Sequence, residues 1–212
     1  PRKALVLVPQ DDEKAMRAET AAIISQSAEA LQMDLGTVQQ LHDGIDRLFL
    51  RDYAGARDTW AALEASDPRT PIFDVGQALI YQGLMMENFD FKYEDQYWHH
   101  SNVAKERLEA ALEVPGNDAF ETFLLGGMVG IEGIHVMRQG EFVSSFARGV
   151  EALRVVEDCK KLAPDFVDPL LADGIYNYWR TAVAQATRLI PSFGDKRALG
   201  ISQMQEAARG GL

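Results

Sequence analysis

The chain has 212 residues, of which 47% are hydrophobic, enough to fill one core of ordinary size or a short solenoid. Its 21 Lys and Arg residues against 32 Asp and Glu residues give a net charge of -11, which repels phosphate backbones and argues against nucleic acid as a partner. We therefore expect a single domain spanning residues 1–212.

Residues 1–35 are predicted to form an N-terminal arm and a leading helix. The continuous apolar run at 4–8 indicates either a short extended arm or a disordered terminus. A helix is expected over 12–32, where small residues recur at helical spacing on one stripe: Ala15, Ala18, Ala22 and Ser25. Such a stripe lets a helix dock closely on the first repeat as a cap, which we favour, or on a neighbouring subunit.

The segment 53–68 carries the most informative pattern in the chain. It has an aromatic residue at the helix start, then a small residue, a second aromatic residue and an apolar residue, and it ends in Asp-Pro. Two closely packed helices require this order of side chains, and the proline ends the helix. Those places are held by Tyr53, Ala56, Trp60, Leu63 and Pro68. The segment resembles the second helix of a tetratricopeptide hairpin, whereas the preceding helix, 38–50, matches that consensus only at Gly44.

Three prolines close helices of the same type further along the chain. Pro68 and Pro115 are 47 residues apart, and Pro115 and Pro164 are 49 apart, which is longer than the usual repeat of about 34 residues. We place the excess in longer helices and in stretched connections at 87–96 and 189–194.

Four helix pairs are therefore expected between 37 and 210. First helices are predicted at 38–50, 72–87, 119–138 and 169–188, and second helices at 53–66, 101–114, 142–162 and 195–209. Start signals agree: Pro71 and Pro169 suit a first turn, and Asn117 and Asp195 suit N-caps. The predicted fold class is all-α, a TPR-like array of antiparallel helix hairpins forming an α-α superhelix.

Gly126, Gly130 and Gly133 fall on one side of the predicted helix 119–138. Because Gly costs a helix interior roughly 1 kcal/mol relative to Ala, three on one face favour close approach by another helix. The alternative is a ligand lying against the bare backbone. A phosphate loop is excluded because no strand precedes these glycines and the GxGxxG order is absent.

A second resemblance involves the end of the chain. The order of residues in 173–178, 190–201 and 207–210 looks like the closing unit of the tetratricopeptide-type inclusion-body clearance family and of related bacterial envelope repeat proteins. The resemblance covers about the last fifth of the chain, and it implies an adaptor rather than an enzyme.

The best argument for catalysis is a metal site built on Glu132 and His135, an E-x-x-H pair on one side of a helix. It would be joined by Asp95 and His99 or by Glu94 and His100, the histidines lying in a loop-prone segment. A di-iron carboxylate bundle needs this pair twice, and the chain has it once. Cys159 has no histidine near in sequence to act as its base, so we expect a structural thiol.

Binding is the better expectation, and it rests on aromatic and polar side chains. Tyr and Trp gather at 93–98 and at 176–179, where core packing is the competing reading. Solenoids of this kind place their first helices on the inner face, so the candidate partner-binding residues are Tyr81, Gln82, Glu132, His135, Asn177 and Arg180.

We therefore expect a non-catalytic binding or assembly module, an adaptor for a protein or peptide partner, with no cofactor and no metal. The alternative is a lipid- or small-molecule-binding component of a bacterial envelope transport system, in which Met85, Met86, Met128 and Met137 suit an adaptable apolar cavity. A carboxylate and histidine metal enzyme is the third reading.

The compartment stays open between periplasm or cell envelope and cytoplasm, because the lone Cys159 fits either. The most apolar stretch, 123–137, is shorter than the roughly 20 residues of a membrane span, so no transmembrane segment is expected. Because the sequence begins at Pro1, we expect a processed or trimmed form, with any signal peptide upstream. A homo-oligomer is left open.

Overall fold

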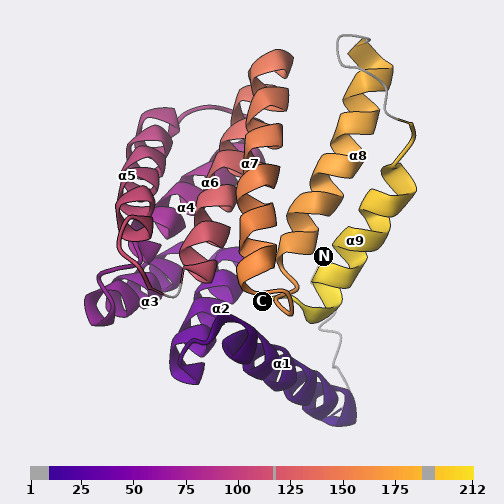
Figure 1. Cartoon of the computed structure of the whole chain (residues 1–212). Coiled ribbons are helices and arrows are strands. Elements are labelled where there is room, and N and C mark those ends of the chain that lie inside the picture. Colours follow the sequence, from indigo (N-terminus) through magenta and orange to yellow (C-terminus); the bar gives the residue numbers. More distant parts are fainter. Residues whose placement is uncertain (1–9, 117, 188–193) are drawn as a thin grey trace, which may run out of the picture.

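The computed structural model describes residues 10–116, 118–187 and 194–212, and these are all-α, with no strand among them (Figure 1). The helices described are α1 (Gln10–Leu31), α2 (Leu35–Phe49), α3 (Tyr53–Ser66), α4 (Ile72–Asn88), α5 (Glu94–Leu112), α6 (Ala119–Arg138), α7 (Phe142–Leu162), α8 (Pro169–Thr187) and α9 (Arg197–Gly210).

Each helix packs on the next one along the chain, and packing is most extensive within the pairs α2–α3, α4–α5, α6–α7 and α8–α9. Weaker contacts join α4 to α6 and α6 to α8, so the first helices of successive pairs also touch. Figure 1 shows α6 to α9 running side by side, with α1 and α2 below them and α3 to α5 on the far side of α6. Leu212, beyond α9, packs against the buried cluster of α1 and α2. Packing is therefore strongest between helices that follow one another in the chain.

Local signals explain several helix ends. The carboxylates of Asp34 and Asp52 accept hydrogen bonds from the backbone N–H groups of Thr37 and Gly55, both at 3.0 Å, and so cap α2 and α3. Gly140 ends α6 with φ of 88°, a left-handed conformation that Gly adopts without strain. Asp195 was expected at the N-cap of α9 but lies two residues before the helix. Its carboxylate accepts a hydrogen bond from the backbone N–H of Arg197 and forms a salt bridge with the Arg197 guanidinium. The arm at 4–8, Asn117 and most of the connection at 189–194 lie outside the described residues.

The predicted start of α5 was wrong. The helix begins at Glu94 rather than at 101, so the connection from α4 is residues 89–93, and His99 and His100 are helical. Two acidic residues in the first turn favour an early start because they complement the helix dipole. A buried stripe at helical spacing begins before residue 101 and continues along the helix: Tyr97, Ser101, Ala104 and Leu108.

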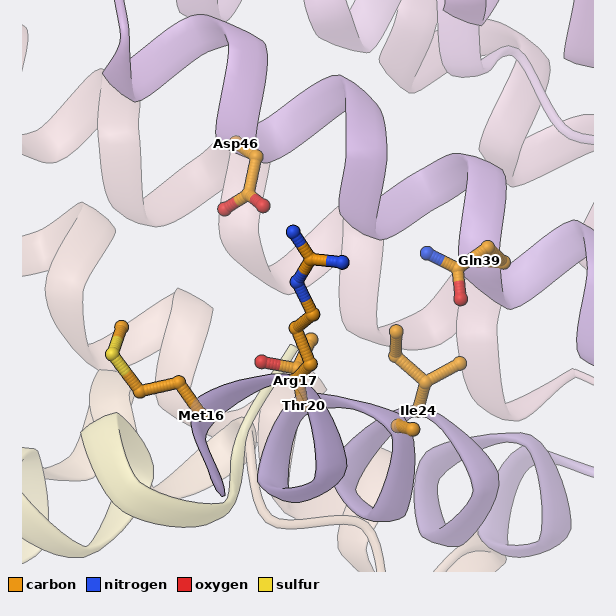
Figure 2. Close-up of a pocket in the computed structure, with 7 residues that line it drawn as sticks. Met16, Arg17, Thr20, Ile24, Gln39 and Asp46 are labelled. Atoms are coloured by element: carbon orange, nitrogen blue, oxygen red, sulfur yellow. The ribbon is translucent and has the colours of Figure 1, made fainter. Parts of the chain in front are cut away.

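The expected docking of the small-residue stripe of α1 on the first repeat was also wrong, whereas its docking on a neighbouring subunit stays a prediction. Ala15, Ala18, Ala22 and Ser25 are all exposed, and α1 packs on α2 through another face: Ile24, Ser27, Ala28 and Leu31. Ile24 and Leu31 bury more apolar area than alanines do, so the face that carries them packs on α2. A hollow of about 390 Å³ remains between α1 and α2, where Arg17 points from α1 toward the α2 residue Asp46 (Figure 2).

The core centres on Trp60 of α3, which is almost fully buried between α2 and α4. A Cβ atom at Gly44 would lie 2.1 Å from its Nε1, and one at Gly76 would lie 1.9 Å from its Cε3. Neither separation is sterically allowed, so both glycines are required for the indole to fit.

By length and composition alone, α6 could cross a membrane. More than half of its most apolar window, 56%, is buried inside the structure. A core helix passes the same test, so this property is weak support for a membrane span.

Candidate functional site

A large apolar hollow, here called the inner groove, runs along the face of the array formed by α2, α4, α6, α7 and α8. Its volume is about 420 Å³, within the roughly 300–1,000 Å³ that is usual for small-molecule sites. Leu212 lies in its lining as well. A hollow of this size and character is the best-formed candidate site among the described residues.

Helical stripes of apolar residues build the walls of the inner groove. On α2 the stripe is Leu41, Ile45 and Phe49, spaced by four residues so that all three share one face. On α8 two adjacent stripes face the groove: Leu171, Ile175 and Trp179, and beside them Ala172, Tyr176 and Arg180. Trp179 remains 46% exposed, which is more apolar surface in water than a closed core would leave.

Asp168 is the one carboxylate among the described lining residues, and it lies just before α8. Its oxygens accept hydrogen bonds from the backbone N–H of Leu212 at 3.0 and 3.1 Å. Burial raises the pKa of Asp168 from its ordinary 3.8 to about 7, because ionisation in apolar surroundings is costly, while the hydrogen bond from Leu212 opposes the rise. The groove therefore holds a carboxyl group that titrates near neutral pH.

Arg180 is the one cation among the described lining residues. Its guanidinium carbon lies 5.3 Å from the centre of the Tyr176 ring, within the range of a cation–π contact. The Tyr176 ring lies 6.3 Å from the Phe146 ring of α7. These contacts place Arg180 at the end of the groove where α7 begins.

Four glycines of α6, Gly126, Gly127, Gly130 and Gly133, line the inner groove, and three of them also pack on α7. Gly126, Gly130 and Gly133 approach α7 closely: a Cβ atom at Gly126 would lie 2.7 Å from a methyl carbon of Val156. Helix packing, which the sequence favoured, is therefore confirmed for these three. Gly127 also lines the groove, but a Cβ atom there would meet nothing within 4 Å. That position leaves backbone open to whatever fills the groove.

The candidate residues predicted from the sequence do not gather in one place. Of the six, only Arg180 lines the inner groove. Asn177 faces α9, where its amide donates to Gln203 at 2.9 Å. Tyr81 stacks on His100 of α5, with ring centroids 5.8 Å apart.

Gln82 and His135 meet in the interior, on the side of α6 that faces α4 and α5. The Nδ1 atom of His135 lies 2.9 Å from the Gln82 side-chain oxygen, and its Nε2 atom lies 3.1 Å from a Glu94 oxygen. Tyr97 stacks on the imidazole with ring centroids 4.6 Å apart. The hydrogen bond from His135 lowers the pKa of the Glu94 carboxyl, and burial only partly offsets it. His135 is thus fully enclosed by partners.

Glu132 is 0% exposed and belongs to a polar cluster that joins three helices. Its carboxylate accepts from Ser101 at 2.7 Å and pairs with Lys105 of α5 and Arg148 of α7. Two cations and a hydroxyl therefore satisfy this buried charge, which ties α6 to both neighbours.

The acidic residues and histidines whose spacing in the sequence suits a metal site do not gather around one point in the structure. Among the described residues, no three His, Cys, Asp or Glu side chains lie close enough to hold a metal ion.

Of the four methionines of interest, Met128 and Met137 line the inner groove, whereas Met85 is buried in the core and Met86 is exposed.

Comparison with known proteins gives no relative for this chain: no protein-family model, no curated protein and no solved structure matches it. The site must therefore be interpreted from its own geometry.

Proposed function

We propose that this chain is a non-catalytic, TPR-like binding module whose inner groove holds an elongated apolar ligand. The observation that carries the proposal is the groove itself, a hollow of about 420 Å³ walled by apolar stripes from four first helices and from α7. Apolar walls with a few polar groups are what small-molecule sites usually have.

The assignment to the TPR-like class is supported by the pairing of the helices and by the contacts between successive first helices. Trp60 supports it too, because the aromatic that the repeat pattern places on a second helix packs between Gly44 and Gly76 of two first helices. No catalytic step is proposed, since the strongest polar groups, Glu132 and His135, are enclosed by partners away from the groove.

The chemistry of the walls favours an apolar small molecule as the occupant. Apart from Asp168 and Arg180, the described lining residues carry no charge, and most of them are apolar. Methylene groups suit such walls better than the polar side chains and backbone of a peptide. We infer that the lipid- or small-molecule-binding alternative comes ahead of the adaptor.

Binding of a neutral apolar dye tests the proposal without reference to any head group. N-phenyl-naphthylamine fluoresces when it leaves water, so titration of the purified protein gives an affinity. We expect saturable binding by native protein and at least about tenfold weaker binding by Gly127→Leu, whose new side chain would occupy the groove.

Gly83→Leu is the matched control. Gly83 is also helical with nothing within 4 Å of its Cβ position, but it does not line the groove. Both substitutions replace a helical glycine, so neither is expected to lower helix stability. Equal dye binding by all three proteins, or no binding by native protein, would contradict the proposal.

A second candidate function, the adaptor for a protein or peptide partner, is favoured by one specific observation. Large apolar residues are exposed where first helices turn into second helices, and we call residues 49–52, 89–93 and 139–143 the turn edge. Exposure there reaches 80% at Phe49, 80% at Leu50, 91% at Phe89 and 70% at Val143. Phe89 also has φ of 52°, a left-handed conformation that is costly for a bulky residue.

Contacts along the turn edge hold its segments together: the Nε atom of Arg51 lies 2.8 Å from a Glu87 oxygen, and Gln139 donates to Glu94. Exposed aromatics on an ordered edge are typical of protein contact sites. We expect the native protein to capture a partner from an extract of the source cells, and Phe89→Ser to lose this capture. Val114→Ser is the control, because Val114 is exposed at the opposite ends of the helices, and it should capture the partner as the native protein does. Capture of the same proteins by all three would contradict this second candidate, and sedimentation of the purified protein would detect self-association.

A further inference from the structure

The inner groove reaches the turn edge, because two aromatic residues belong to both. Phe49 and Phe142 line the groove and also lie in the segments 49–52 and 139–143 of the turn edge. Phe49 is 80% exposed and Phe142 is 38% exposed, so the apolar wall of the groove continues into apolar surface that faces solvent. A ligand that enters or leaves the groove at this end passes over that surface.

The three segments of the turn edge are joined into one continuous surface. Besides the contact between Arg51 and Glu87, the Arg138 guanidinium donates to the carbonyl oxygens of Met85 and Asp90 at 2.9 and 3.1 Å. Neighbouring turns therefore carry the four most exposed apolar side chains of the edge: Phe49, Leu50, Phe89 and Val143. Contiguous exposed apolar surface of this kind marks an interaction site for a protein or a membrane.

Backbone hydrogen bonds at these turns favour a lipid bilayer as the partner. The N–H groups of Leu50 and Phe89 donate to carbonyl oxygens one helical turn earlier, at 2.9 and 3.4 Å. The carbonyl oxygen of Asp90 accepts from Arg138. A protein partner can supply hydrogen bonds that a turn lacks, whereas hydrocarbon cannot, so backbone groups that enter a bilayer have to be satisfied beforehand. The turn edge meets this requirement at Leu50, Phe89 and Asp90.

Charge on the turn edge also suits a bilayer of zwitterionic lipid. The edge carries two cations, Arg51 and Lys92, and three carboxylates, so it is nearly neutral, whereas the whole chain has a net charge of -11. Phosphocholine head groups likewise carry both signs, so the edge and the lipid surface complement each other. The Nζ atom of Lys92 lies 5.3 Å from the centre of the Tyr93 ring. Aromatic rings beside basic side chains are typical of the membrane interface.

We propose that the turn edge docks on the surface of a lipid bilayer, and that the apolar ligand passes between the bilayer and the inner groove at this end. This inference rests on the proposed function, since it names the source of the ligand of the same groove. Phe49, Leu50 and Phe89 enter the hydrocarbon, and Lys92 stays at the head groups. An apolar ligand partitions into the bilayer rather than water, so a docked groove receives it without exposing it to solvent.

Flotation with vesicles of phosphatidylcholine tests the docking. We expect native protein to float with the vesicles. Phe89→Ser and Leu50→Ser should each bind at least about tenfold more weakly, because each loses an apolar side chain that enters the hydrocarbon. Val114→Ser is the control, since Val114 is 62% exposed at the opposite ends of the helices, and it should float as native protein does. Native protein that stays out of the vesicle fraction, or equal binding by all three variants, would overturn the inference.

Vesicles that contain anionic phosphatidylglycerol separate apolar docking from attraction between charges. The net charge of -11 opposes approach to an anionic surface, so we expect binding to weaken as phosphatidylglycerol replaces phosphatidylcholine. Binding that requires phosphatidylglycerol would overturn the docking by apolar side chains.

Transfer of the neutral dye from the protein to vesicles that carry a quencher tests the route of the ligand. If transfer takes place in the docked complex, its rate rises in proportion to the vesicle concentration, and we expect this for native protein and Val114→Ser. Phe89→Ser should transfer the dye more slowly at the same vesicle concentration. A rate for native protein that does not depend on vesicle concentration would mean that the dye first leaves into water, and would overturn the proposed route.

The two levels of proposal fail differently. Phe89 is not among the described lining residues, so Phe89→Ser should bind the dye without vesicles as native protein does. If native protein binds the dye but not the vesicles, the groove stands and the docking on a bilayer is wrong. Capture of a protein or self-association through the turn edge would then assign that edge to a protein partner or to a second copy. If the dye does not bind, the proposed function fails together with the transfer, while flotation still decides the docking. Far-UV circular dichroism and urea unfolding check that each variant is folded.

Discussion

Replacing Asp168 by Asn should leave the stability of the protein unchanged below about pH 4 and raise it progressively up to about pH 7, above which the gain is constant. The folded state holds the Asp168 proton up to about pH 7, whereas the unfolded chain releases it near the ordinary pKa of 3.8. Between these values the folded state binds the extra proton, so stability from this group is complete below about pH 4 and falls as the pH rises to about 7. Asn cannot ionise, and its side-chain oxygen still accepts from Leu212.

The magnitude follows from the separation of the two pKa values. Each pH unit between them changes the free energy of unfolding by about 1.4 kcal/mol. From about pH 5 to about pH 7 this amounts to about 3 kcal/mol, and over the whole interval to at most about 4 kcal/mol. Titration of the other carboxyl groups is common to both proteins and cancels in the difference between them.

Urea unfolding followed by far-UV circular dichroism, repeated from about pH 5 to about pH 8, measures this difference. Asp165→Asn is the control, because Asp165 is an exposed aspartate three residues away and its substitution removes the same charge outside the groove. A stability difference for Asp168→Asn that stays constant with pH, or that grows toward acid, would refute the reasoning.

Three further outcomes are expected. Gly76→Ala should lower the free energy of unfolding by about 1–3 kcal/mol, because its Cβ would lie 1.9 Å from the Trp60 ring. Gly83→Ala should raise the free energy of unfolding by up to about 1 kcal/mol, because its Cβ would meet nothing within 4 Å. Urea unfolding of both variants measures these changes. Glu132→Gln should lower the free energy of unfolding by about 2–3 kcal/mol, because Lys105 and Arg148 lose their buried anion. A variant as stable as the native protein would show that solvent satisfies both cations. Burial raises the pKa of Cys159 to about 11, so alkylation by iodoacetamide at neutral pH, followed by mass spectrometry, should be about a hundredfold slower than in urea-unfolded protein.

Helix positions were predictable wherever local signals and apolar period agreed. The predicted bounds 53–66, 119–138 and 142–162 match α3, α6 and α7 because a proline, a glycine or an acidic cap marks each end. The start of α5 is missed because the predicted connection covers 87–96 and the aromatic segment with His99 and His100 looks loop-prone. Tyr97 is in fact fully buried as part of a helical stripe, and only tertiary packing reveals this.

The groove was harder to predict than the fold, because the side of each helix that faces it depends on how the pairs rotate. Asn177 and Arg180 are three residues apart, yet the first faces α9 and the second faces the groove. The sequence predicts both as binding residues only because their side chains are polar. A better signal was the long apolar stripe of α8, which continues to an exposed Trp179 and so exceeds what a buried core requires.

The seat of Trp60 between two glycines fixes how the first hairpin and the next one are aligned. If α2 slid by one residue past the indole, Asp43 or Ile45 would replace Gly44; if α4 slid, Val75 or Gln77 would replace Gly76. Each of these residues brings a side chain into space that the ring already fills. The alignment is therefore set by two positions that lack a side chain, and a bulkier residue at either one would be accommodated only together with a smaller residue at position 60. In any set of related chains, these three positions are expected to vary together.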